Sequence, residues 1–241
     1  MNWEKLLFRT LYLLSAKKCE LFKRRYKTAQ FQNNKIILIR DGKETVLPPY
    51  TYIKGLHLEF NGNNNTVCIE YSSHFHHSKI SFNGDNNQVN FGKNVSGAFH
   101  FQLNHSNNHI CLGSRVEAGH FSATLHGDKL IIGNNCMFSC GIKAWTDGHA
   151  VIDAATRKLL NPPGHIIQIG DHVWIGENVV LLKRTNIPSN CIVAHSSVVT
   201  KAFDEENCIY AGNPAKAVKR GINWNGRSPV AYNPETANPL F

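Results

Sequence analysis

A histidine two residues after an aspartate stands where an otherwise periodic sequence loses its rhythm. The stretch AWTDGHAVI, residues 144–152, places Asp147, Gly148 and His149 between two blocks of regularly spaced aliphatic residues. An imidazole has an ordinary pKa of about 6.5, so at neutral pH it can accept a proton from a substrate. Asp147 either orients His149 or caps the turn before Gly148. We therefore take His149 and Asp147 as the candidate catalytic residues.

The residues before this stretch repeat with a period of about twenty. The segments NGNNNTVCIE (61–70), NGDNNQVNFG (83–92), NHSNNHICLG (104–113) and LHGDKLIIG (125–133) follow one another in steps of 22, 21 and 20 residues. Each ends in apolar-x-apolar followed by Gly or Glu. Self-similarity at this period is typical of a solenoid.

The later part of the sequence sharpens the repeat to six residues. An aliphatic residue recurs at Ile169, Ile175, Leu181, Ile187, Val193 and Val199. Four residues after each of the first five comes a small or β-branched residue: Val173, Val179, Thr185, Cys191 and Ser197. A period of six fits neither a helix nor an alternating strand. It predicts a triangular coil with one short strand per face, in which the aliphatic residue points inward.

A break in the repeat predicts a loop that carries His149. The step from Ile132 to Ile169 is 37 residues, which is one coil of eighteen plus about nineteen more. The extra residues fall near 145–165, with His149 near the base, and loops on rigid scaffolds are common places for chemistry. We divide the chain into an N-terminal helix and hairpin (1–53), the solenoid with this loop (54–202) and a C-terminal extension (203–241).

Four motifs in a fixed order carry a family resemblance: TDGH, IQIGDHVWIGENVVLL, AHSSVVTK and IYAGNPAKAVKR. In this order they resemble the acetyl-CoA-dependent acetyltransferases of the hexapeptide class, such as galactoside and maltose acetyltransferases. The GNNN coils, the basic N-terminal segment and the KRGINW tail look more like bacterial capsule and polysialic-acid O-acetyltransferases. The resemblance implies an all-β solenoid, a left-handed parallel β-helix, over roughly residues 54–220.

The resemblance also implies a reaction and its base. His149 matches the catalytic histidine of the family and would remove the proton of a sugar hydroxyl. The sugar oxygen would then attack the thioester of acetyl-CoA directly, without an acyl-enzyme. Hydrogen-bond donors, which we expect to be backbone N–H groups of a neighbouring coil, would stabilise the oxyanion. The acceptor would be a hydroxyl on a capsular or lipooligosaccharide glycan, one class of which contains sialic acid.

The family pattern further implies a binding site for CoA. Trp174 matches the aromatic residue beside the pantetheine arm, and Gly176 follows where the backbone could approach the cofactor closely. The remaining matches are His195, Thr200, Lys201, Lys216 and Lys219. The lysines suit the phosphate charges of CoA. AHSS replaces the commoner G-A-G-S, which brings His195 to the groove. No metal is expected, since HFHH (74–77) lacks an evident carboxylate or cysteine partner.

Partners follow partly from charge and partly from the family. Lysine and arginine exceed aspartate and glutamate by 26 − 17, which gives +9 and suits an anionic partner such as an acidic polysaccharide. No nucleic-acid-binding motif occurs, and Leu6 to Ala16 is too short and too basic for a membrane span. The family implies a homotrimer with sites between subunits. The seven scattered cysteines indicate reduced, mostly buried thiols and a cytoplasmic protein.

The N-terminal segment leaves two interpretations open. Residues 1–26 carry apolar residues near helical spacing and are otherwise basic, which predicts a helix. It either packs on the protein or a partner subunit, or holds the enzyme peripherally at the inner face of the membrane. Residues 33–49 predict a hairpin that turns at Asp41 and Gly42.

Three rival functions keep the same fold. One is N- or O-acetylation of a small or nucleotide-linked sugar, which needs the same base and donor. Another is a zinc carbonic anhydrase, for which the spacing shows no set of three histidine ligands. The third is a non-catalytic solenoid that binds glycans through its repeated Asn and His corners. Such a protein would have no reason to retain the TDGH, HVWIG and GNPAK motifs together.

Overall fold

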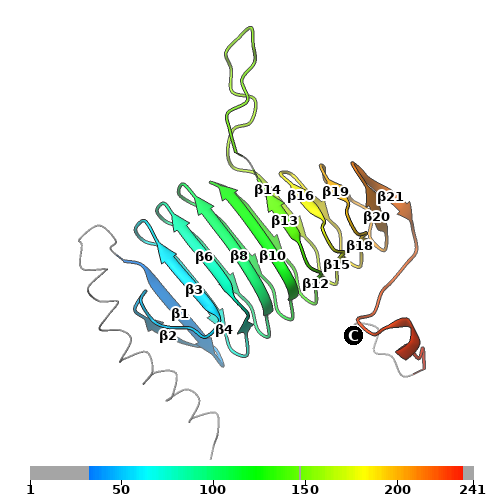
Figure 1. The fold of residues 1–241 in the computed structure, drawn as a ribbon, viewed down its shortest axis with the longest axis horizontal. Helices are drawn as coiled ribbons and strands as arrows, with labels where there is room; N and C mark the ends of the chain where they lie inside the picture. Colours follow the sequence, from blue (N-terminus) through cyan, green and yellow to red (C-terminus); the bar gives the residue numbers. More distant parts are fainter. Residues whose placement is uncertain (1–32, 147, 236–241) are drawn as a thin grey trace, which may run out of the picture.

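Short parallel strands stacked turn upon turn make an elongated all-β solenoid (Figure 1). The computed structural model describes residues 33–146 and 148–235. The helix predicted for residues 1–26 therefore lies outside the described residues, as does Asp147. Within the described part, no helix is long and apolar enough to cross a membrane.

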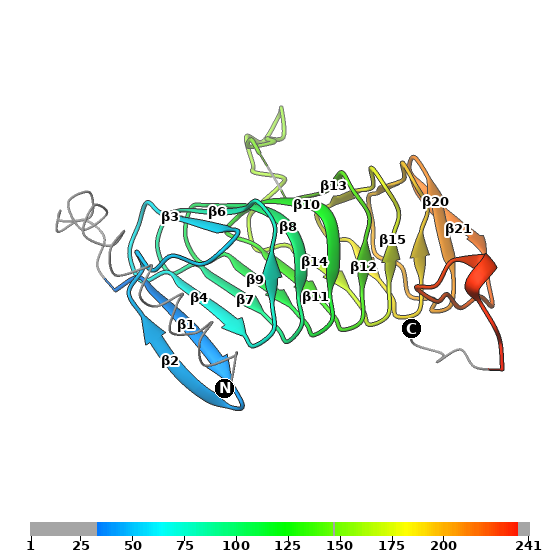
Figure 2. The same cartoon turned by 60° about the horizontal axis from the view of Figure 1, so that its bottom comes forward.

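The strands form three ladders that each turn of the chain visits in order. The first ladder contains β1 (Lys35–Arg40), β4 (Thr66–Glu70), β7 (Gln88–Phe91), β9 (His109–Leu112), β11 (Lys129–Ile132), β14 (Ile166–Ile169) and β17 (Asn186–Ile187). Figure 2 shows β4, β7, β9 and β11 of this ladder side by side.

The second and third ladders share two long strands, β8 (Ser96–Asn104) and β10 (Glu117–His126). The second ladder contains β5 (His74–Phe75), the first parts of β8 and β10, β12 (Met137–Phe138), β15 (Trp174–Ile175), β18 (Ile192–Val193) and β20 (Ile209–Gly212). The third contains β3 (Leu56–Phe60), β6 (Ser78–Asn83), the later parts of β8 and β10, β13 (Ile142–Trp145), β16 (Val180–Leu182) and β19 (Val198–Val199).

The structure confirms that the later coils repeat every six residues. Each hexapeptide from Ile166 to Val199 contributes one short strand, from β14 through β19. All six aliphatic positions of the repeat, from Ile169 to Val199, are buried, and so are the five small residues between them. Earlier coils fill the same interior with stacked aromatic rings, such as Phe121 on Phe138 with centroids 5.0 Å apart. This continuous apolar core keeps the coils in register.

Buried asparagines explain the GNNN repeat of the earlier coils. The side-chain oxygen of Asn34 accepts the backbone N–H of Asn65 at 2.8 Å, and Asn65 does the same for Asn87 at 2.9 Å. The series continues from Asn87 to Asn108 at 2.8 Å and from Asn108 to Gly127 at 2.7 Å. This series of asparagines accepts backbone N–H groups at the corner between the third and first strand ladders. At that corner no neighbouring strand supplies an acceptor.

The two ends of the solenoid are antiparallel hairpins. β1 pairs with β2 (Lys43–Leu47), with Asp41 and Gly42 between them at positive φ. β1 also pairs in parallel with β4, so a solenoid strand lies within the range 1–53. At the other end β20 pairs with β21 (Ala215–Lys219) and, in parallel, with β18, so the second ladder continues beyond residue 202. Strand pairing in the two sheets thus continues into residues 1–53 and 203–241, and the three-part division stays a prediction.

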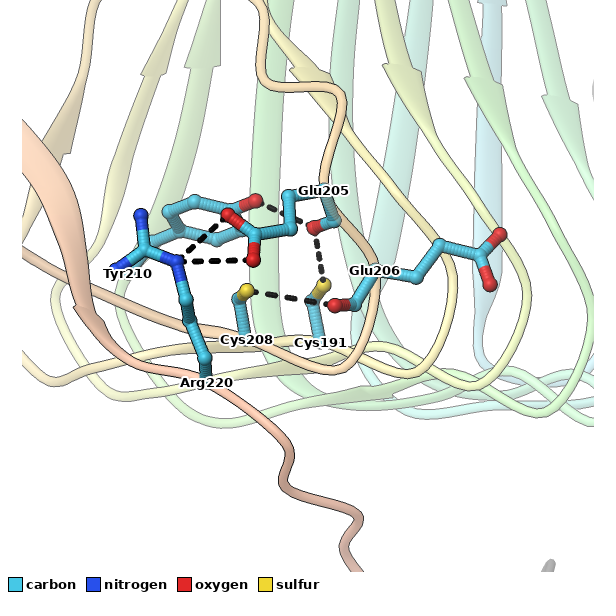
Figure 3. A network of polar contacts seen from close by, with 6 residues as sticks. All are labelled: Cys191, Glu205, Glu206, Cys208, Tyr210 and Arg220. Carbon is cyan, nitrogen blue, oxygen red and sulfur yellow. Dashed lines mark hydrogen bonds and ion pairs between the residues drawn. The ribbon is translucent and has the colours of Figure 1, made fainter.

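A polar network fastens the last turn to the chain that follows it (Figure 3). The Tyr210 hydroxyl donates to the carbonyl of Glu205 at 2.5 Å, and Arg220 Nε lies 2.9 Å from each carboxylate oxygen of Glu205. Burial raises the pKa of the Tyr210 phenol, so the hydroxyl stays a donor. The tail then runs through a short 3-10 helix, η1 (Pro229–Ala231).

The six described cysteines are free thiols. Cys136, Cys191 and Cys208 are buried, as expected, and burial raises the pKa of Cys136 to about 12. Cys140 is exposed.

Candidate functional site

The chain leaves the solenoid between β13 and β14 and returns twenty residues later (Figure 1). We call residues 146–165 the arm; its base lies at the corner between the third and first ladders. Ile152 and Leu159 form an antiparallel bridge, and the Leu160 N–H donates to the Val151 carbonyl at 2.8 Å. The two limbs of the arm therefore pair with each other as they project from the solenoid.

Two buried side chains anchor the limbs to the preceding coil. The buried Thr146 hydroxyl donates to the Thr124 carbonyl at 3.4 Å and accepts the His126 N–H at 3.3 Å. On the returning limb, Asp128 Oδ1 accepts the N–H groups of Gly164 at 2.8 Å and His165 at 2.6 Å. Asp128 is a positioning residue that we did not identify from the sequence. Its only signal there is that it directly precedes the apolar run of its repeat, in HGDKLIIG.

The arm presents His149 to solvent. Asn161 joins the two limbs at this point, because its Nδ2 donates to the His149 carbonyl at 2.8 Å and its Oδ1 accepts the Val151 N–H at 2.6 Å. The Trp145 indole lies beside Gly148, the residue before His149. Its Nε1 is 3.8 Å from the position that a Cβ on Gly148 would occupy. Trp145 is 49% exposed. We did not identify Asn161 or Trp145 from the sequence.

Trp174 lies elsewhere, as the first residue of β15 in the second ladder. It is 38% exposed, and its Nε1 lies 3.5 Å from Ser139 Oγ. Its Cα partners are Met137 on one side and Ile192 on the other. The arm leaves where the third ladder passes to the first, whereas β15 follows the first ladder. Within one chain, therefore, the first ladder separates the base of the arm from Trp174.

The structure gives a packing reason for a glycine at position 176, which the sequence did not reveal. Its N–H donates to the Val193 carbonyl of the next coil at 2.8 Å. A Cβ here would lie 2.7 Å from the backbone nitrogen of His195, which is closer than real Cβ contacts come. The imidazole of His195 is exposed, with Nδ1 4.0 Å from Glu177 Oε2.

The other predicted binding residues divide between these two regions. Thr200 and Lys201 are exposed directly after β19, at the corner from which the arm leaves, and Lys201 Nζ is 5.7 Å from the ring centroid of Phe203. Lys216 and Lys219 are exposed on β21, which pairs with β20 of the second ladder. The candidate residues thus form one group at the arm corner and another along the second ladder.

His74 and His76 of the HFHH segment are exposed on either side of the buried Phe75. Among the described residues, no three His, Cys, Asp or Glu side chains are arranged to hold a metal ion.

A hexapeptide solenoid with a histidine on an extruded arm has the architecture of a β-solenoid acyltransferase, and comparison with known proteins specifies the class further. No family model matches the chain. A polysialic acid O-acetyltransferase of Neisseria meningitidis is 30% identical over 206 residues, which cover 75% of this chain and 95% of that protein. One of Escherichia coli O1:K1 / APEC is 33% identical over 117 residues, but the match spans 48% of this chain and only 38% of the relative.

The solved structures agree with the sequence relatives. The crystal structure of the polySia specific acetyltransferase NeuO superposes with a TM-score of 0.74 at 26% identity, over 87% of this chain and 85% of that one. The chain belongs to the hexapeptide-repeat acetyltransferases, the family of the polysialic acid O-acetyltransferases. The resemblance read from the four motifs is thereby confirmed.

Proposed function

We propose that the protein transfers an acetyl group from acetyl-CoA to a sugar hydroxyl of a bacterial surface polysaccharide. The observation that carries this proposal is the match along 95% of the Neisseria meningitidis polysialic acid O-acetyltransferase. The net charge of +9 supports an acidic polymer as the acceptor. The solenoid has the left-handed sense of its family.

His149 is the general base of this reaction. It accepts the proton of the sugar hydroxyl while the sugar oxygen attacks the carbonyl carbon of the thioester. A new C–O ester bond forms, the C–S bond breaks, and His149 passes the proton to the departing thiolate of CoA. The clamp that Asn161 makes on the His149 carbonyl supports this role, since it restricts the backbone that carries the imidazole. Asp147 orients His149.

The second ladder and the end of the solenoid bind the donor. Trp174 lies against the pantetheine arm, and its exposed ring supports that contact. The close approach of the coils at Gly176 leaves no side chain there to block the groove. His195 and Thr200 lie along the groove. The exposed lysines of the candidate site, Lys201, Lys216 and Lys219, bind the phosphates of CoA as point charges.

Three subunits complete three sites. The arm of a single chain exposes four large apolar side chains, each between 42% and 54% accessible: Val151, Ile152, Leu159 and Leu160. An apolar surface of this kind on a projecting element favours burial against another copy. In the trimer, His149 of one subunit meets Trp174 of the next. This arrangement accounts for the separation of the two residues within one chain.

We place the reaction in the cytoplasm, which holds the acetyl-CoA. Attachment to the inner face of the membrane through residues 1–26 stays a prediction.

The test is release of CoA thiol from acetyl-CoA against a panel of acidic and neutral bacterial polysaccharides. Wild type is compared with His149→Ala, and His76→Ala serves as the control because His76 is also exposed. We expect release that depends on an acidic polymer and falls about 10²- to 10⁴-fold in His149→Ala alone. Unchanged release in His149→Ala would remove this residue from the mechanism. Thiol release that requires a nucleotide-linked sugar would show that the acceptor is such a sugar and not a polysaccharide. Absence of CoA binding would refute the proposed transferase activity.

A further inference from the structure

The tail returns to the solenoid fifty residues back along the sequence. The Trp224 ring stacks on the His172 imidazole, with centroids 4.3 Å apart and planes 6° apart, and its Nε1 donates to the His172 carbonyl at 2.8 Å. His172 Nε2 lies 3.2 Å from Asn223 Oδ1 and 3.1 Å from the Trp224 carbonyl. These contacts fix the backbone of the tail at the corner between the first and second ladders.

A pocket of about 540 Å³ opens between this docked tail and the coils that precede Trp174. Its wall includes Arg115, Glu117, Asn135, Met137, Trp224 and Arg227. Met137 and Trp224 supply the apolar part. The tail therefore contributes both an aromatic ring and a guanidinium to a hollow whose other wall is the solenoid.

The charge of the pocket favours an anion. Arg115, Arg227 and Glu117 contribute +1 + 1 − 1, which leaves +1. Arg115 Nε donates to Asn135 Oδ1 at 2.5 Å, which orients the guanidinium on the pocket wall. In the part of the chain that the structure describes, the Arg227 guanidinium makes no ion pair and no hydrogen bond. Two guanidinium groups at one hollow suit a carboxylate, because each presents paired N–H donors in a plane.

The pocket borders the proposed reaction centre on the side of Trp174 away from Lys216 and Lys219. Met137 is the strand partner of Trp174, and the Trp224 and Trp174 ring centroids are 6.1 Å apart. Lys216 and Lys219 belong to β21, which lies on the other side of β15 from β10, the strand that begins at Glu117. A donor whose phosphates meet the lysines and whose pantetheine meets Trp174 therefore points its thioester toward this pocket.

We propose that the pocket between the tail and the second ladder is an acceptor subsite that binds the carboxylate of an acidic sugar unit. The inference rests on the proposed function, and it names the group by which the acceptor is held. Arg115 and Arg227 bind the carboxylate, and Trp224 and Met137 contact the sugar ring. Glu117 faces the same hollow, so its charge weakens the binding of any anion there.

The subsite is tested by calorimetric binding of α2,8-linked oligosialic acid to the full chain in the absence of acetyl-CoA. The variants are Arg115→Ala, Arg227→Ala, Arg227→Lys and Glu117→Gln. Lys43→Ala is the matched control, because it removes one exposed positive charge from β2 at the far end. We expect each Arg→Ala change to weaken binding about tenfold or more. Glu117→Gln tightens binding, Arg227→Lys retains part of it, and Lys43→Ala leaves it within about twofold.

CoA binding and acetyl transfer, measured on the same proteins, separate the outcomes. Wild-type transfer to the polymer with unchanged binding by both Arg→Ala variants overturns the subsite and leaves the proposed function intact. Weaker binding of CoA, rather than of the oligosaccharide, assigns the pocket to the donor and also overturns the subsite. A wild-type protein that neither binds the oligosaccharide nor transfers acetyl groups to any polysaccharide refutes both proposals.

Discussion

The indole of Trp224 lies parallel to the imidazole of His172 and donates a hydrogen bond to the carbonyl of the same residue, 52 positions earlier in the chain. Trp174 lies beside the pair at 6.1 Å from Trp224. The tail and the second ladder therefore share one aromatic cluster. The tail therefore forms part of the surroundings of Trp174, the residue proposed to contact the donor.

Removal of the Trp224 ring should release the tail. Trp224→Ala loses the stacking and the hydrogen bond, a local loss on the order of 1–3 kcal/mol. We expect faster cleavage by trypsin after Arg220 and Arg227, measured by mass spectrometry, while the solenoid itself stays resistant. Trp145→Ala is the control, because that indole is half exposed on the arm side. Equal cleavage rates in wild type and Trp224→Ala would show that the tail is held by other contacts.

Gly176 should tolerate no side chain, for reasons of packing alone. In Gly176→Ala the new Cβ meets the backbone of His195 at 2.7 Å and the Val193 carbonyl at 2.9 Å, so two coils must separate. We expect a loss of about 1–3 kcal/mol in the free energy of unfolding, measured by urea denaturation. Gly148→Ala is the matched control, since its Cβ would have nothing closer than 3.8 Å. Equal stability of the two variants would contradict this account.

The sequence predicted the coils well because their determinants are local. One buried aliphatic residue per hexapeptide defines each short strand from β14 to β19, and the alignment of GNNN blocks marks the earlier turns. The spacing did not show that β8 and β10 continue through a corner with a register shift at Ala118 to Phe121. Phenylalanine rings fill the interior of these coils, and ring packing has no fixed period in the sequence.

The site was less accessible to prediction because it depends on contacts between distant residues. His149 and Trp174 were identified by motif, yet within one chain His149 lies on the arm and Trp174 on the second ladder. The docking of Trp224 on His172 joins residues more than fifty positions apart, and no repeat relates them. Asp128 anchors the arm across 37 residues in the same way. Such pairs become visible only once the coils are stacked.

The buried series of asparagines, which includes Asn87, should contribute far more to stability than the exposed series beside it, which includes Asn83. Asn87 Oδ1 accepts the backbone N–H of Asn108 at 2.8 Å, so Asn87→Ala leaves that buried N–H without its partner and costs about 1–3 kcal/mol. Asn83, in the same coil, is exposed and bonds to Asn61 and Asn104 through its side chain. We expect Asn83→Ala to change the free energy of unfolding by less than about 1 kcal/mol. Similar urea midpoints for the two variants would refute the distinction.

Acid should weaken the first ladder through His109. Burial lowers the pKa of this imidazole below its ordinary value of 6.5, and Lys129 on the next strand lowers it further. The neutral ring also accepts a hydrogen bond from Asn90 Nδ2 at 3.0 Å. Because the folded pKa is the lower one, the stabilisation is complete above the ordinary pKa and is lost as the pH falls through the folded value.

The corresponding measurement is the melting temperature between about pH 7 and about pH 5. His109→Gln keeps a partner for Asn90 without a titrating group, so it should lose less stability over this range than wild type. His74→Gln, an exposed position on the second ladder, should behave like wild type. A steeper acid loss in His109→Gln would reverse the sign that we assign.

Charge placed on the arm should dissociate the proposed trimer and abolish activity together. Leu159→Asp combined with Leu160→Asp puts two carboxylates on the exposed apolar limb, where burial against a partner would desolvate them. Sedimentation should change from three times the 27.0 kDa chain mass to one, with no change in the solenoid's melting temperature. Val46→Asp, on an exposed strand remote from the arm, should stay trimeric. Because the first ladder separates the base of the arm from Trp174, a monomer holds only half of each proposed site. An active monomer would therefore contradict the shared site, even if the wild type proves to be a trimer.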